Sequence, residues 1–114
     1  MGLKTTNYTV KKLGIKLPEA YAIVKDLTVR GQHGHATIAV QSSRENAEKV
    51  VTGKMAALEE HRIDFTVNRD ENDRATAYAK AKSQKEVQRF NEERNELETV
   101  LVNEPFYGWI DDIN

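Results

Sequence analysis

Apolar and polar residues alternate along several segments of the chain, which is the pattern of a β-strand with one buried face. Residues 21–30 and 35–41 both alternate in this way. Between them, Gly31-Gln32-His33-Gly34 supplies two glycines that can take the positive φ of a tight turn. Residues 21–41 therefore predict a β-hairpin.

Two further strands follow from the same criteria. Residues 5–10 are β-branched and aromatic, and residues 61–67 alternate with their apolar side chains on one face. We expect residues 11–17 to prolong the first strand. Gly14 would then be a break in that strand and Pro18 its end, because proline cannot donate to a strand ladder.

Two segments carry helix signals. Ser42 and Glu45 fit a capping box, which predicts a short helix within an irregular excursion over residues 44–60. Asn72 is a good N-cap, and the alanine-rich segment 73–83 after it predicts a helix. The apolar stripe of this second helix is thin, so its backbone is expected to lie close to a sheet.

Residues 84–102 fit two structures. Their apolar residues could sit on a continued, highly charged helix, or residues 86–91 and 97–102 could form two strands joined by a turn near Glu93-Arg94-Asn95. The composition of residues 97–102, Leu-Glu-Thr-Val-Leu-Val, favours the hairpin.

These elements predict an α+β fold: a β-rich twisted sheet or partly closed barrel of five to six mainly antiparallel strands, with one packed helix. A length of 114 residues suits a single domain spanning residues 1–114. Without cysteine the chain has no disulfide or thiolate site. Apolar runs are short and no secretory signal precedes the first strand, so we expect neither a membrane partner nor signal-directed secretion.

The last residues of the chain are unusually aromatic for a terminus. Phe106, Tyr107 and Trp109 are three of the eight aromatic residues, and large rings gain free energy only when they are covered. Residues 105–114 are therefore a candidate docking tail, which either closes the protein's own core or binds another chain. The predicted protein interface consists of Tyr107, Trp109, Ile110, Asp111 and Asp112, whereas Phe106 is expected in the core.

Charge is unevenly distributed, although the net charge is only −1. Residues 1–16 carry four lysines and no acid, and residues 92–114 carry seven acids and one arginine. Either the two ends pair within one fold, or the asymmetry orients copies or neighbouring proteins head to tail. The edges of the 21–41 hairpin offer a second route of association, by strand addition.

The sequence contains no recognisable catalytic, metal-binding or phosphate-binding motif. A calcium loop starting at Asn68 would place Asp73 where glycine is needed and Ala79 where a bidentate glutamate is needed. His33 and His35, with the distant His61, could in principle bind zinc, but position 33 is expected in the turn and no cysteine or obvious acidic ligand adjoins it. No serine lies in a glycine-flanked elbow, and no glycine loop could cradle phosphate. We therefore expect no enzyme, no metal and no cofactor.

A binding module is the alternative function. Five strands with a helix between the fourth and fifth are compatible with an OB-like barrel that binds single-stranded nucleic acid, with Tyr8, Tyr21 and Phe65 stacking on bases. The near-neutral charge argues against a nucleic-acid partner, because such surfaces gather basic residues on one face.

Three segments together carry a resemblance: Met-Gly-Leu-Lys-Thr-Thr-Asn-Tyr-Thr-Val at the start, Phe65-Thr66-Val67-Asn68 through Ala77-Tyr78, and Gly108-Trp109-Ile110-Asp111-Asp112 at the end. The chain resembles small proteins encoded in tail and baseplate gene clusters of bacteriophages and prophages of Gram-positive bacteria. This resemblance implies a virion-associated or assembly protein, found in the virion or in the host cytoplasm during assembly. It implies packing against other phage structural proteins or against copies of itself, and no catalytic residue. The chain departs from the pattern in its lengthened, charged region 83–104.

Overall fold

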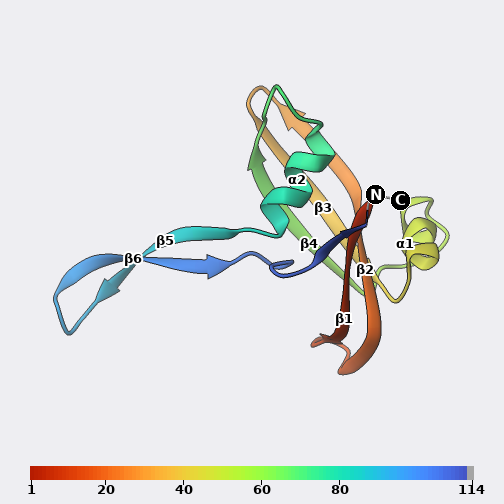
Figure 1. Cartoon of the computed structure of the whole chain (residues 1–114), viewed down its shortest axis with the longest axis horizontal. Coiled ribbons are helices and arrows are strands. Elements are labelled where there is room, and N and C mark those ends of the chain that lie inside the picture. The colour runs from red at the N-terminus through yellow and green to blue at the C-terminus, as the bar shows by residue number, and fades with distance from the viewer. Residues whose placement is uncertain (113–114) are drawn as a thin grey trace.

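Seven strands and two helices make up residues 1–112, the part of the chain that this computed structural model describes. They are β1 (Gly2–Val10), β2 (Ile15–Arg30), β3 (His33–Gln41), α1 (Arg44–Val51), β4 (Glu59–Thr66), α2 (Asp73–Ala81), β5 (Gln84–Asn91), β6 (Glu96–Asn103) and β7 (Ile110–Asp112). Five strands form an antiparallel sheet in the order β4-β3-β2-β1-β7, and β5 and β6 form a separate hairpin (Figure 1). The predicted α+β class is confirmed. Within residues 1–112 the main sheet stays open and is not closed into a barrel.

The first two strands differ from the prediction. Residues 11–14 form a turn, and β2 begins at Ile15, so the prediction that residues 11–17 prolong the first strand is wrong. Pro18 lies inside β2 and does not end it. This half of β2 pairs only with β1, since β3 begins to pair at Tyr21, and a strand without a second neighbour tolerates proline. Opposite Pro18, Asn7 takes a positive φ of 51°.

The predicted hairpin of residues 21–41 is confirmed as β2 and β3, with a tighter turn than expected. Arg30 pairs with His33, so only Gly31 and Gln32 lie in the turn, and Gly31 has a φ of +62°. Gly34 belongs to β3 and serves packing: a Cβ there would come within 2.3 Å of the Phe65 ring on β4. The ring covers the glycine, which fixes β4 against β3.

The edges of this hairpin are mostly covered. β4 pairs with β3 from residue 33 to residue 40, and β1 pairs with β2 as far as Ala22. The prediction of exposed hairpin edges is therefore wrong for β3, and it holds only for residues 23–30 of β2, where neither β1 nor β7 has a paired residue. A register shift between Val24 and Asp26 bends that open segment, a common protection of sheet edges.

Each helix begins directly after a residue whose side chain caps its N-terminus. Ser43, one residue after the predicted Ser42, caps α1 by accepting from the Asn46 N–H, so the predicted capping box is wrong. Asn72 caps α2 as predicted, and α2 ends at Ala81. This helix lies across one face of the sheet (Figure 1), and the Tyr78 hydroxyl accepts from the Val24 N–H at 2.7 Å. The main core lies between α2 and the sheet. No helix among the described residues is long and apolar enough to cross a membrane.

Candidate functional site

The β5–β6 hairpin projects from the rest of the molecule as an arm (Figure 1). We call residues 84–103 the arm and residues 1–83 with 104–112 the body. The two strands pair with each other along their whole length, from Gln84 opposite Asn103 to Asn91 opposite Glu96. The hairpin favoured from the sequence is confirmed, and the helix alternative is wrong. Because of the arm, the molecule extends 51 Å along its longest axis and only 21 Å along its shortest.

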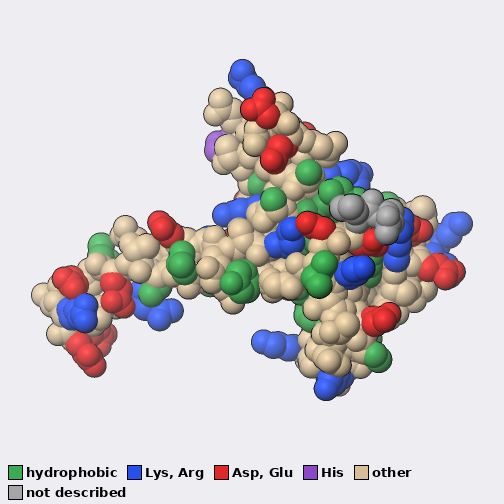
Figure 2. All heavy atoms as spheres, in the orientation of Figure 1, with side chains coloured by type: hydrophobic (Ala, Val, Ile, Leu, Met, Phe, Trp, Pro, Cys, Tyr) green, Lys and Arg blue, Asp and Glu red, His purple; other side chains and the backbone are tan. Residues whose placement is uncertain are grey.

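Large apolar side chains of the arm are exposed to solvent. Phe90 is 54% exposed, Leu97 66% and Leu101 62%. Side chains alternate between the faces of a strand, and Phe90 pairs directly with Leu97, so these three share one face of the arm. Val87 and Val100 form a second apolar pair on the opposite face. The arm in Figure 2 accordingly shows green hydrophobic side chains along its length.

The arm is fixed where it leaves the body. The Glu104 N–H donates to the Ser83 carbonyl at 3.0 Å, and the Phe106 N–H donates to the Ala81 carbonyl at 3.0 Å. These bonds join the returning chain to the C-terminal end of α2. The direction of the arm is thus set by a helix end that is itself packed on the sheet.

An aromatic cluster lies under this attachment. Phe106 is fully buried, and its ring stands edge-on to Trp109 at 4.9 Å and to His61 at 5.3 Å between centroids. Trp109 in turn meets Tyr8 at 5.1 Å. Edge-to-face contacts of this kind add to the stabilisation from burial. The tail therefore closes the protein's own core, with Phe106 in the core as expected and Trp109 only 8% exposed.

A small polar network borders the cluster. The Glu59 carboxylate accepts from the Tyr8 hydroxyl and lies 2.9 Å from the His61 Nε2. Burial, together with the bond to Glu59, raises the pKa of Tyr8 above its usual range. The Tyr8 hydroxyl thus serves as a donor that pairs with the Glu59 carboxylate. The network links β1 to β4 beside the buried rings.

The predicted interface residues divide into two groups. Tyr107, Ile110 and Asp111 lie at the surface, and Asp111 pairs with Lys82 at 2.7 Å. Trp109 and Asp112 are buried by the protein itself. Interface roles for the exposed residues stay predictions. Residues 113 and 114 of the predicted docking tail lie outside the described residues.

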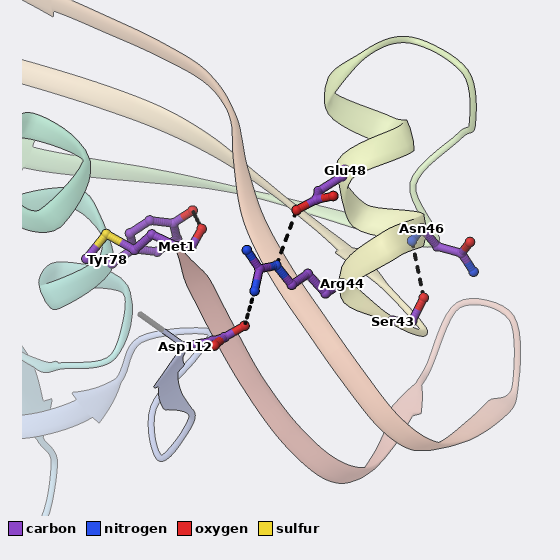
Figure 3. Close-up of polar contacts among 7 residues, drawn as sticks. All are labelled: Met1, Ser43, Arg44, Asn46, Glu48, Tyr78 and Asp112. Atoms are coloured by element: carbon purple, nitrogen blue, oxygen red, sulfur yellow. Dashed lines mark hydrogen bonds and ion pairs between the residues drawn. The ribbon is translucent and has the colours of Figure 1, made fainter. Parts of the chain in front are cut away.

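Arg44, the first residue of α1, holds the tail on its other side. Its guanidinium lies 3.8 Å from the Asp112 carboxylate and 3.2 Å from that of Glu48, so one side chain joins β7 to α1 (Figure 3). A shallow groove of about 510 Å³ runs beside this pair, partly lined by Tyr21 and Ile110. Burial and the neighbouring Asp112 carboxylate raise the pKa of Tyr21. The opposite charges of Arg44 and Asp112 in this groove pair with each other.

The lysines near the start of the chain do not pair with the acids near its end. Within residues 1–112, Lys4, Lys11, Lys12 and Lys16 form no ion pair, although the two ends meet as strands β1 and β7. The two ends thus pair within one fold as strands, as one of the two interpretations expected, but without ion pairs between these lysines and the described acids. Lys11 and Lys12 stand on the exposed β1–β2 turn, and Lys16 is exposed at the start of β2.

Other candidate sites are not assembled. His35 lies opposite Asp64 and His61 opposite Ile38, so the histidines are spread along the strands. No group of three or more histidines and acids in the described part of the chain could hold a metal ion. Tyr21 and Phe65, proposed as stacking residues, are buried in the fold.

Sequence reasoning missed the arm as the most exposed apolar surface. The signal was present in the apolar residues between positions 87 and 102, but they fall on both faces of the hairpin and so resemble neither a one-sided strand nor a clean helix stripe. Two-sided apolar strands normally lie in the middle of a protein. Comparisons with protein-family models, with curated proteins and with solved structures find no match to this chain.

Proposed function

We propose that this protein is a non-enzymatic structural or assembly subunit that acts through protein–protein association, with the arm as its docking element. The observation that carries the proposal is the exposure of Phe90, Leu97 and Leu101 on a hairpin that leaves the body. An isolated two-stranded hairpin is at best marginally stable in water. A partner that covers the arm would supply the packing that the body does not give it.

The resemblance to phage tail and baseplate proteins supports the same class. Proteins of that class work by packing against copies of themselves or against neighbouring structural proteins. An arm with apolar residues on both faces suits insertion between neighbours in such an assembly, because both faces are then removed from water. We propose a tail or baseplate component of a bacteriophage or prophage.

The experiment is co-expression of the full chain with the proteins encoded beside its gene, followed by purification and light scattering. The test variant is Phe90→Ser with Leu97→Ser. The matched control is Gln88→Ser with Thr99→Ser, a directly opposed polar pair on the same arm. We expect a stoichiometric assembly from the wild type and the control, and association at least about tenfold weaker for the test variant.

Two results would contradict the proposal. One is a wild-type chain that remains monomeric alone and with each neighbouring protein. The other is an assembly that the Phe90 and Leu97 substitutions leave unchanged, since the arm would then have no part in it. Circular dichroism of the variants shows that any loss of assembly occurs with the body still folded.

A further inference from the structure

We infer that the partner of the arm is a second copy of this chain, and that the arm tip of one molecule docks on the β1–β2 turn of the next. The inference rests on the proposed function and adds a partner and a receptor surface to it. We call residues 90–98 the arm tip and residues 10–16 the basic turn. Both carry exposed apolar side chains at their centres, and their charges are opposite.

The arm tip combines apolar side chains with acidic ones. Phe90 and Leu97 form an exposed cross-strand pair, and the turn beyond them carries Glu92 and Glu93. Residues 90–98 hold four glutamates against one arginine. Figure 2 shows these acidic side chains in red at the far end of the arm. Glu92 and Glu93 form no ion pair among the residues that the structure describes, so both remain available to a cationic surface.

The basic turn has the complementary composition. Lys11, Lys12 and Lys16 surround Leu13, which is 52% exposed, and Ile15, which is 44% exposed. No acid lies between residues 10 and 16. The N–H groups of Leu13 and Gly14 donate to the Val10 carbonyl within the turn, and Gly14 has a φ of +66°. An apolar centre with a charged rim is the usual composition of a protein interface.

The two surfaces belong to different molecules in this contact. In Figure 1 the arm and the β1–β2 turn point away from the body in different directions, so the tip does not reach its own turn. Each copy therefore offers one free tip and one free turn. Such a head-to-tail contact builds a closed ring if the rotation between copies closes, and a filament if it does not. Opposite charges on the two surfaces orient and accelerate the encounter.

Charge reversal tests the pairing directly. The tip variant is Glu92→Lys with Glu93→Lys, and the turn variant is Lys11→Glu with Lys12→Glu. Each variant alone opposes like charges, whereas an equimolar mixture restores both opposite-charge contacts. We expect self-association of each single variant to weaken roughly tenfold or more in light scattering, and the mixture to recover wild-type behaviour. The control Lys54→Glu with Arg69→Glu, at exposed body positions, changes the net charge by the same amount as the turn variant and should associate like the wild type.

The outcomes separate this inference from the proposed function. Recovery in the mixture, with wild-type association falling as salt rises, supports tip-to-turn docking. A turn variant that associates as the wild type does, while the Phe90 and Leu97 substitutions still abolish association, overturns the turn as receptor and leaves docking by the arm in place. A wild-type chain that stays monomeric alone but binds a neighbouring protein through the arm overturns the second copy as partner.

Discussion

The body and the arm use the same kinds of residue with opposite results. In the body, Phe106 and Trp109 are enclosed by Tyr8, by His61 and by the sheet. In the arm, Phe90 and Leu97 meet each other across two strands and are otherwise open to water. The two regions join at the C-terminal end of α2. The exposed Phe90 and the buried Phe106 are therefore separated by one strand of the arm and its attachment to the body.

This difference shows that the aromatic content of a segment does not by itself identify a docking surface. The tail at residues 105–112 is the most aromatic part of the chain, and it closes its own core. The arm is less aromatic, but nothing in the body covers it. What distinguishes them is the presence of a packed neighbour: α2 and the sheet for the tail, and only the opposite strand for the arm.

The largest expected difference in stability is between phenylalanine-to-alanine substitutions in the body and in the arm. Phe106→Ala removes a fully buried ring from the cluster beneath the arm, and we expect it to lower the free energy of unfolding by about 3–5 kcal/mol. Phe90→Ala should change it by no more than about 0.5 kcal/mol, because no cavity forms at an exposed site. Urea denaturation followed by circular dichroism measures both values. Equal losses at the two positions would mean that the arm packs on the body in solution.

A smaller loss is expected from one hydroxyl in the body. Tyr78→Phe leaves the Val24 N–H without its 2.7 Å acceptor and the Met1 carbonyl without its 3.3 Å donor. A buried donor without a partner costs about 1–3 kcal/mol, which is the expected fall in the free energy of unfolding. Tyr107→Phe is the control, since that residue is exposed and should be neutral within about 0.5 kcal/mol. A neutral Tyr78→Phe would show that Val24 finds another acceptor.

Substituting one asparagine in each region compares the body with the arm through the loss of a single side-chain hydrogen bond. Asn72 accepts from the Arg74 N–H at the start of α2, and Asn72→Ala should destabilise the fold by about 1 kcal/mol. Asn91 accepts from the Glu93 N–H in the turn of the arm, so Asn91→Ala should speed amide exchange in the arm without lowering the global free energy of unfolding. Hydrogen exchange read by mass spectrometry separates the two effects. Slower amide exchange in the arm than in the body would contradict the prediction that the arm opens locally while the body stays folded.

Much of the body could be predicted because its local signals agree with its tertiary contacts. Alternation identified the β2–β3 hairpin and β4, and Asn72 with the alanine-rich segment identified α2. The predictions were wrong where the extent of a strand depends on its neighbours in the sheet. Pro18 is tolerated because β3 does not reach it, and Gly34 lies in a strand because the Phe65 ring covers it.

The candidate site was less predictable than the fold. Exposure of the arm depends on what lies beside it in space, and the alternation of residues 84–103 carries no information about that neighbour. The charge asymmetry was visible, but whether Lys11 and Lys12 meet an acid within the chain depends on where the β1–β2 turn points. Strand β7 is only three residues long, and the aromatic residues before it obscured its pairing with β1.

The smallest effect on stability is expected from removing most of the arm. Replacing residues 87–100 by Asn-Gly keeps Glu86 opposite Leu101 and closes the shortened hairpin with a two-residue turn. Because the deleted residues pack on one another and the attachment through Ser83 and Ala81 is retained, the free energy of unfolding should change by less than about 0.5 kcal/mol. Thermal and urea unfolding of dilute protein measure this change, and light scattering of the same sample at high concentration should show that association is lost. A shortened chain that unfolds much more easily would make the arm part of the body's core, and the separation between a self-sufficient body and a partner-dependent arm would fail.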